Sequence, residues 1–233
     1  MIKSYYKFIP FPCDSCSDNC VLTGSKSNIC DKLVRYNVAV LERQLEMMNL
    51  EDALNYFGDI INLNVKGVVH VPCIYAANHT SYLDPILIML AMKDISGISI
   101  VVAEEVANKF TGFCNDIKCI TINRDGNPLN IIHKIEVEMT DKCIIFPEGT
   151  RSRDGKLQKL KSGVGQIAID KGCLIQPIYI KGAYEIWSPY DSIPQKGLSV
   201  TVEFLEPIQP VTRKQVTKDL HDILEEKENE YSY

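Results

Sequence analysis

The residues with the clearest chemical potential lie in one short stretch, Asn78-His79-Thr80-Ser81-Tyr82-Leu83-Asp84-Pro85. On one continuous helix, positions five apart point about 140° away from each other, so His79 and Asp84 cannot share a helical face. We therefore expect His79 to lie in a turn where the chain folds back and brings Asp84 to its ring. A carboxylate bonded to one ring nitrogen fixes the tautomer and leaves the other nitrogen free as a general base. Such a pair can deprotonate a hydroxyl group that belongs to a substrate.

Two elements must position this pair. The apolar run Cys73–Ala77 predicts a buried strand before it, and Asp84-Pro85 predicts the start of a helix that runs to about Met92. In this interpretation Asp84 is the N-cap residue and Pro85 occupies the first helical position. An aspartate before a proline is also an ordinary helix cap without catalytic function, so the stretch alone leaves both interpretations open.

Further charged residues follow later predicted strands. Arg124 comes after one apolar run, and Glu148 and Arg151 come after the next. In open α/β sheets ligands bind beyond the carboxyl ends of the strands, so we expect these residues to face the same crevice as His79. The planar guanidinium group suits a phosphate. Taken singly, each arginine is also consistent with an exposed surface charge.

Strands and helices alternate along most of the chain, which predicts an α/β fold with a mixed central sheet flanked by helices. The predicted strands are residues 60–66, 73–77, 97–102, 119–122, 143–146, 174–180 and 198–204. The predicted helices are residues 31–48, 50–57, 84–92, 104–110, 127–139, 162–171 and 212–228. Asn49 is expected to cap the second of these helices and Gly172 to end the sixth. We expect a loop and two amphipathic helices in residues 1–60 and one domain in residues 61–233.

Composition narrows the class of protein. A chain of 233 residues can bury a proper core. The formal charge of −5 argues against a general nucleic-acid-binding protein. No apolar run approaches the roughly 18 residues of a membrane-spanning helix, and the N-terminus lacks the apolar core of a signal peptide. We expect a cytoplasmic protein that contacts membranes only peripherally.

The sequence contains nine cysteines, an odd number, so they cannot all pair with one another. Without a secretory signal, reduced thiols are expected. Cys13, Cys16, Cys20 and Cys30 fall early, and the first pair suggests a metal site. The gaps that follow fit no common zinc pattern, which favours free thiols over a structural metal.

Residues 151–161 carry five positive charges and one negative charge. A run of this kind is consistent with an anionic membrane, a nucleotide-containing donor or an acidic carrier protein as partner. It is equally consistent with a solvated loop.

Four motifs in this order resemble those of the glycerolipid acyltransferase family, in particular the bacterial-type 1-acyl-sn-glycerol-3-phosphate acyltransferases. They are Asn78-His79 with Asp84, Ile122-Asn123-Arg124, Phe146-Pro147-Glu148-Gly149-Thr150-Arg151-Ser152, and Ile175-Gln176-Pro177-Ile178. The resemblance covers about residues 62–210. It implies the αβ fold of that family, with His79 as the base and Asp84 as its partner. By the same resemblance, the acceptor site would be lined by Arg124, Glu148, Gly149, Thr150 and Arg151, and Pro177 would help to shape the acyl-donor side.

The implied reaction moves a fatty acyl group from acyl-CoA or acyl carrier protein to the free hydroxyl of 1-acyl-glycerol-3-phosphate, giving phosphatidic acid. Because thioesters are already activated, this chemistry requires no metal, no cofactor beyond the acyl thioester and no covalent enzyme intermediate. The alternatives are an acyltransferase or transacylase for another lysolipid or an amino-acid-derived lipid, and a non-catalytic lipid- or metal-binding module. A serine hydrolase built on Ser81 fits poorly, because the chain contains no Gly-x-Ser-x-Gly motif.

Overall fold

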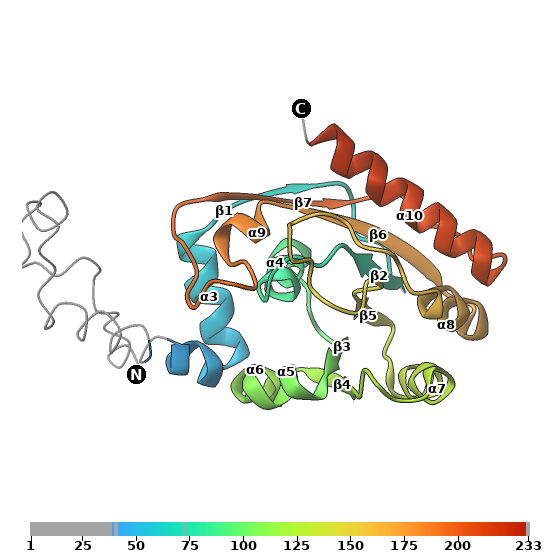
Figure 1. Cartoon of the computed structure of the whole chain (residues 1–233), viewed down its shortest axis with the longest axis horizontal. Helices are drawn as coiled ribbons and strands as arrows, with labels where there is room; N and C mark the ends of the chain where they lie inside the picture. Colours follow the sequence, from blue (N-terminus) through green and yellow to red (C-terminus); the bar gives the residue numbers. More distant parts are fainter. Residues whose placement is uncertain (1–38, 40–41, 72, 232–233) are drawn as a thin grey trace, which may run out of the picture. The chain divides into compact units, whose positions relative to one another are not determined.

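A computed structural model describes residue 39 and residues 42–71 and 73–231 (Figure 1). Packing separates the chain into two units, Met1–Gln44 and Leu45–Tyr233. All helices and strands named below belong to the second unit. The four early cysteines lie outside the described residues, so the choice between free thiols and a metal site stays a prediction. The division into residues 1–60 and 61–233 also stays a prediction.

The second unit is built on a seven-stranded sheet with the order β1-β7-β6-β2-β5-β3-β4. The strands are β1 Asn62–Lys66, β2 Cys73–Ala77, β3 Ile98–Ala103, β4 Lys118–Ile122, β5 Lys142–Ile145, β6 Leu174–Lys181 and β7 Ser199–Phe204. All neighbouring strands are parallel except β6 and β7, which are antiparallel. The predicted mixed sheet is therefore confirmed. The carboxyl ends of β2, β3, β4, β5 and β6 lie at one edge of the sheet.

Helices pack on both faces of this sheet (Figure 1). They are α3 Leu50–Ile60, α4 Asp84–Met92, α5 Glu104–Lys109, α6 Thr111–Asp116, α7 Pro128–Glu138, α8 Gly163–Lys171, α9 Ala183–Ile186 and α10 Arg213–Glu230. Successive side chains of a strand point to opposite faces. Ile74 and Ala76 of β2 join a buried cluster with residues of α7, α8 and α10. Tyr75 and Ala77 of the same strand are also fully buried. Helix α3 packs on α4, and α4 packs on β1 and β7.

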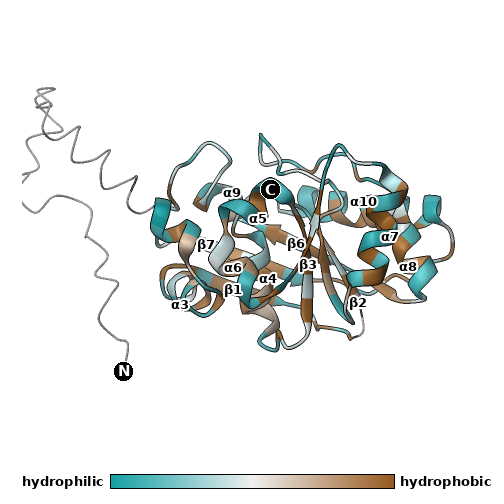
Figure 2. Ribbon diagram, turned by 90° about the horizontal axis from the view of Figure 1, so that it is seen from below, coloured by the Kyte–Doolittle hydropathy of each residue, from teal (hydrophilic) through white to brown (hydrophobic). Residues whose placement is uncertain are grey.

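Amphipathic patterning explains how the outer helices attach to the sheet. In Figure 2 hydrophobic segments follow the strands, whereas α7, α8 and α10 alternate hydrophobic and hydrophilic residues along their length. On α10 the buried residues are Val216, Leu220 and Leu224, spaced four apart on one face. The inner faces of these helices therefore complete the core that supports β2, β5 and β6.

Most predicted elements are present. The side chain of Asn49 accepts a hydrogen bond from the N–H group of Asp52 at 2.7 Å, as a cap of α3 should. Gly172 ends α8 in the left-handed conformation, with φ of 62°. Two short helices, α6 and α9, escaped prediction because each has at most six residues and no clear apolar period. Within the described residues no helix has the length and apolar character needed to span a bilayer.

Gln176 offers a test of how the buried centre of the sheet is held. Its side chain is fully buried in β6 and bonds three backbone groups: the N–H group of His70 and the carbonyl groups of Val68 and Leu205. We expect Gln176→Leu to lower the free energy of unfolding by about 2–3 kcal/mol, because these groups lose their partners. Urea unfolding monitored by circular dichroism would measure this. Gln166→Leu, at a site that bonds only Asp170, is the control, and an equal loss in both variants would contradict the prediction.

Candidate active site

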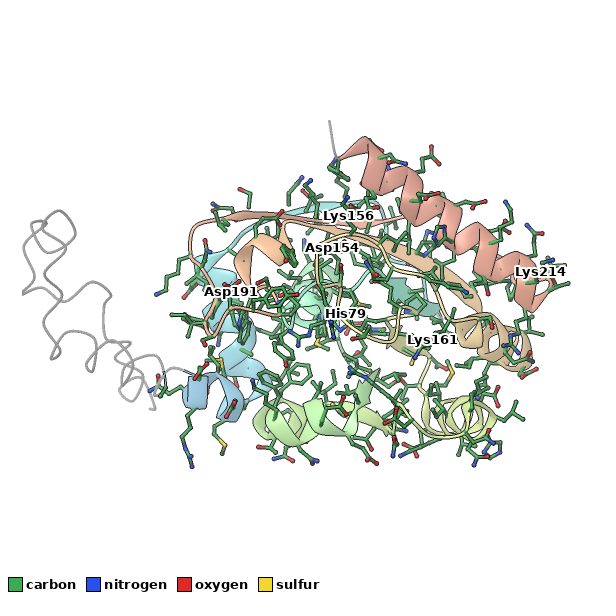
Figure 3. All side chains as sticks on the ribbon, in the orientation of Figure 1. His79, Asp154, Lys156, Lys161, Asp191 and Lys214 are labelled. Carbon is green, nitrogen blue, oxygen red and sulfur yellow. The ribbon has the colours of Figure 1, made fainter. Side chains whose placement is uncertain are left out.

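The turn between β2 and α4 carries His79, which is labelled in Figure 3, and brings its ring to Asp84. Nδ1 of His79 lies 2.7 Å from Oδ2 of Asp84. The same oxygen accepts hydrogen bonds from the N–H groups of Thr80 at 2.7 Å and Ser81 at 2.9 Å. Asp84 is fully buried, so three donors of one turn converge on a single oxygen atom. The geometry that the spacing of the two residues predicted is therefore present.

The predicted N-cap role of Asp84 is wrong. Helix α4 begins at Asp84 itself, and its N-cap residue is Leu83, whose side chain makes no capping bond. The carboxylate of Asp84 turns back toward the preceding turn, because His79 and two N–H groups there already satisfy Oδ2. Pro85 does lie in the first turn of the helix, where its missing N–H group costs nothing.

Two buried polar side chains hold this turn against neighbouring elements. Asn78 donates through Nδ2 to the carbonyl of Ile180 at 2.9 Å and accepts from the N–H group of the same residue at 2.8 Å. The Ser81 hydroxyl donates to the carbonyl of Trp187 at 2.8 Å and accepts from the N–H group of Leu83 at 3.1 Å. The turn is thus fixed to β6 at its beginning and to the end of α9 further along.

The loop after β5 holds the backbone of His79 from the other side. Oε1 of Glu148 accepts from the N–H group of His79 at 2.7 Å, and Oε2 accepts from the N–H group of Gln158 at 3.0 Å. The N–H group of Ser152 donates to the His79 carbonyl at 2.7 Å. The predicted substrate-binding residue Glu148 therefore contacts protein backbone behind the histidine, and its role in binding a substrate stays a prediction.

Burial changes the acidity of Glu148. Removal from water raises the pKa of this carboxyl group to about 8, and the negative charges of Asp84 and Glu228 act in the same direction. The two backbone N–H donors oppose the shift. A side chain that positions the catalytic turn thus titrates close to neutral pH.

A cavity opens beside the ring of His79. Its polar wall is formed by His79, Arg124, Gly149 and Arg151, and the ring of His79 stacks on Phe146 at a centroid distance of 4.1 Å. The rest of the wall is mainly apolar and comes from α3, α4, β3, α5, α6 and the end of β4. A space with cations and a histidine at one end and apolar side chains along the remainder suits an amphiphilic molecule with an anionic head group.

Arg151 brings a buried donor without a partner among the described residues to the cavity wall. Its guanidinium carbon lies 3.4 Å from the centre of the Tyr82 ring, which orients the planar group by a cation–π contact. Its Nη1 atom is buried and has no hydrogen-bond partner among the described residues. Burial, together with the charge of Arg124, lowers the pKa of Arg151. A buried donor without a partner in a cation-bearing cavity is the kind of group that a phosphate oxygen satisfies.

Arg124 is already paired. Its Nη1 atom lies 2.9 Å from Oε1 of Glu105, and the Glu105 side chain is largely exposed. An anion that binds between the two arginines must therefore compete with this carboxylate for Arg124 but not for Arg151. Both arginines, which were predicted from their positions after strand ends, line the same cavity. Arg124 is paired with a carboxylate, whereas Nη1 of Arg151 has no partner among the described residues.

Two predicted binding residues lie elsewhere. Thr150 is exposed, and Pro177 is buried within β6, in register with Ala76 of β2. Neither belongs to the described wall of the cavity. Their proposed roles stay predictions, and the geometry assigns Pro177 a position inside the sheet.

Sequence reasoning overlooked three residues near the site. Tyr82 lies under Arg151, Glu105 pairs with Arg124, and Trp187 contacts Tyr82 edge to face at a centroid distance of 5.6 Å. Tyr82 stands inside the His79 motif, and an aromatic residue there was a signal for a stacked arginine. Glu105 and Trp187 carried no such local signal, because only the tertiary fold brings them to the cavity.

Comparisons with known proteins concern the family and the fold of the chain. A family model described as Acyltransferase matches residues 61–181, just over half of the chain. The 1-acyl-sn-glycerol-3-phosphate acyltransferase of Limnanthes douglasii is 28% identical over 157 residues, covering 64% of this chain and 55% of that protein. The protein of the same name from Cocos nucifera is 27% identical over 158 residues, covering 65% and 51%. The chain thus spans about half the length of the curated relatives it matches.

The fold has a solved counterpart. The crystal structure of the 1-acyl-sn-glycerophosphate acyltransferase from Thermotoga maritima superposes with a TM-score of 0.62. The two chains are 20% identical, and the match covers 87% of this chain and 82% of the other. At this level of identity the match establishes a shared architecture.

The raised pKa of Glu148 predicts a specific pH dependence of stability. Its pKa is 4.5 when unperturbed and about 8 in the folded protein, so the folded state retains a proton that the unfolded state releases. The stabilisation is fully present below pH 4.5 and is lost as the pH rises through 8, with a limiting slope of about 1.4 kcal/mol per pH unit. Urea unfolding between pH 5 and 8 would show wild type losing stability relative to Glu148→Gln as the pH rises. Parallel curves would contradict this, and Glu225→Gln on the exposed side of α10 is the control.

Proposed function

This chain belongs to the acyltransferase family, and we propose that it transfers a fatty acyl group from a thioester to the free hydroxyl of 1-acyl-glycerol-3-phosphate, giving phosphatidic acid. The observation that carries the proposal is the His79–Asp84 pair at the wall of a cavity that has cations at one end and apolar side chains elsewhere. The names of the plant relatives support the choice of acceptor.

In the proposed mechanism His79 acts as the general base. Because Nδ1 donates to Asp84, Nε2 is the ring nitrogen that receives the proton of the acceptor hydroxyl. The hydroxyl oxygen attacks the thioester carbonyl, a C–O bond forms and the C–S bond breaks. His79 then returns the proton to the departing thiolate, while Asp84 stabilises the transient positive charge on the ring.

The phosphate of the acceptor would be held by Arg151 and Arg124. Supporting this role, Arg151 offers a buried Nη1 donor without a partner among the described residues, and stacking on Tyr82 fixes the plane of its guanidinium group. A bidentate contact of this kind positions the glycerol hydroxyl at a defined distance from His79. Gly149 lines the same space, and its left-handed backbone, with φ of 74°, favours glycine at this position.

The acyl chain would occupy the apolar part of the cavity, between α3, α6 and β3. The donor would be acyl-CoA or acyl carrier protein, and the thioester itself supplies the activation that the transfer needs. We place the protein in the cytoplasm, peripherally attached to a membrane, because both the acceptor and the product of this reaction partition into bilayers.

A second acceptor class has one specific observation in its favour. Glu105 places a carboxylate beside Arg124, so the polar end of the cavity carries both signs of charge. A zwitterionic lysophospholipid, or an amino-acid-derived lipid, would match that pattern. Acyl transfer to a panel of lysolipids with anionic and zwitterionic head groups would separate the two candidates.

Removing the proposed base should abolish transfer without unfolding the protein. We expect His79→Ala to lower kcat about 10³-fold, the scale of a lost general base. Incorporation of a labelled acyl group from acyl-CoA into lysophosphatidic acid would measure this, with circular dichroism to verify folding. His133→Ala on the exposed side of α7 is the matched control. Wild-type turnover by His79→Ala would refute the proposed mechanism.

Substitution of Arg151 and substitution of Glu105, the partner of Arg124, should change the KM for the acceptor in opposite directions. We expect Arg151→Gln to raise the KM for lysophosphatidic acid about 10- to 100-fold, because a charged hydrogen bond to the phosphate is lost. Arg153→Gln, at an exposed position of the same loop, should leave KM unchanged. Glu105→Gln should lower KM, because it frees Arg124. Initial rates at varied acceptor concentration would test all three, and an unaltered KM in Arg151→Gln would count against a phosphate site.

A further inference from the structure

Two thiols lie unusually close to each other at the junction of α6 and β4. The Sγ atoms of Cys114 and Cys119 are 2.8 Å apart, with Cys119 donating to Cys114. Heavy atoms that are not bonded normally meet at roughly 3.5–4.0 Å. Both residues are free cysteines and partly buried, so a small reagent can reach them. Among the cysteine side chains that the structure describes, this pair has the contact that a disulfide requires.

The pair also borders the cavity. Cys114 lines its apolar wall together with its neighbour Phe113 in α6. Cys119 lies at the start of β4, and Arg124 follows the end of that strand. At about 3.3 Å per residue, the strand from Cys119 to its end at Ile122 is roughly 10 Å long, and Arg124 lies beyond that end. The thiols therefore adjoin the part of the cavity that is remote from the cationic end.

The chemical environment favours reaction at Cys114. Donation from Cys119 lowers the pKa of the Cys114 thiol, and burial together with this bond raises the pKa of Cys119. The reactive form of cysteine is the thiolate. By contrast, Cys143 is fully buried in β5, and burial raises its pKa to about 11, which makes it a poor nucleophile.

We propose that Cys114 and Cys119 form an oxidation site whose disulfide alters the wall against which the end of a long acyl chain rests. The Cys114 thiolate attacks hydrogen peroxide, forming an S–O bond and releasing one hydroxide, which becomes water. The Cys119 thiol then displaces the second oxygen as water and forms the S–S bond. Two thiols and one peroxide thus yield one disulfide and two waters. A dithiol reductant reverses the step.

The structural consequence follows from where the bond forms. A disulfide would tie α6 to β4 and fix Cys114, which otherwise can yield to a bound chain. In the proposed site a long acyl chain would reach this wall and a short one would not. This part of the inference rests on the proposed acyl-transfer function, whereas the formation of the disulfide does not.

Peptide mapping tests the oxidation site without any assay of activity. The full-length protein is treated with one equivalent of hydrogen peroxide, alkylated with N-ethylmaleimide and cleaved with trypsin. Cleavage after Lys109, Lys118 and Arg124 places Cys114 and Cys119 on separate peptides. We expect a linked pair, Phe110–Lys118 with Cys119–Arg124, that dithiothreitol separates. Alkylation of both peptides after peroxide treatment would overturn the proposal.

Transfer assays test the effect on the cavity. We expect peroxide to reduce the transfer rate with palmitoyl-CoA more than the rate with octanoyl-CoA. Dithiothreitol should restore the original ratio of these two rates. Cys119→Ser should keep the ratio of the two rates under peroxide. Cys173→Ser, which removes a partly buried thiol between α8 and β6, should change that ratio as wild type does. A disulfide that leaves the ratio unchanged would overturn the effect on the cavity.

The two proposals can fail separately. If no acyl transfer occurs with either donor, the proposed function fails. The effect of the disulfide on the cavity is then tested by calorimetry, which compares binding of the same two donors to the oxidised and the reduced protein. If oxidation weakens the binding of palmitoyl-CoA but not that of octanoyl-CoA, the effect of the disulfide on the cavity is supported. Equal binding of each donor to both forms would overturn it.

Discussion

One buried oxygen, Oδ2 of Asp84, is the point on which the arrangement of the site depends. Burying a carboxylate costs several kcal/mol unless donors replace the lost water. Here the ring of His79 and two N–H groups of the same turn supply them at Oδ2, whereas Oδ1 has no partner among the described residues. Those donors converge only while the turn keeps its shape, and Asn78 and Glu148 hold that shape from β6 and from the loop after β5. The orientation of the histidine is therefore a property of the whole sheet edge.

Local features of the sequence predicted much of this arrangement. Short apolar runs located β2, β4, β5 and β6 to within a residue or two, because a buried strand needs a continuous apolar stretch in a mostly parallel sheet. The spacing of His79 and Asp84 implied a turn, since no helix could bring the two side chains together. The cap role of Asp84 was wrong for a tertiary reason: the ring of His79 and the preceding turn bind the carboxylate that a free helix end would have used.

The remaining features of the site needed the fold itself. Glu148 was predicted to line the acceptor site, yet it is buried behind His79 and accepts hydrogen bonds from two backbone N–H groups. Glu105 comes from a helix whose sequence gives no sign of an arginine partner. The order of the strands places these residues together, and neither composition nor periodicity records that order. The same holds for Pro177, whose motif pointed to the cavity although its strand runs through the middle of the sheet.

The ion pair between Glu105 and Arg124 has a consequence for selectivity. The positive charge at the cavity is partly neutralised by Glu105, so an incoming anion gains full contact with both guanidinium groups only by displacing this carboxylate. A phosphomonoester, whose second pKa lies near 6, carries up to two charges at neutral pH, whereas a phosphodiester carries one. We expect this internal counter-ion to act as a threshold of charge: a terminal phosphate displaces Glu105 more readily than a phosphodiester does, unless the phosphodiester head group also carries a cation that pairs with the displaced carboxylate.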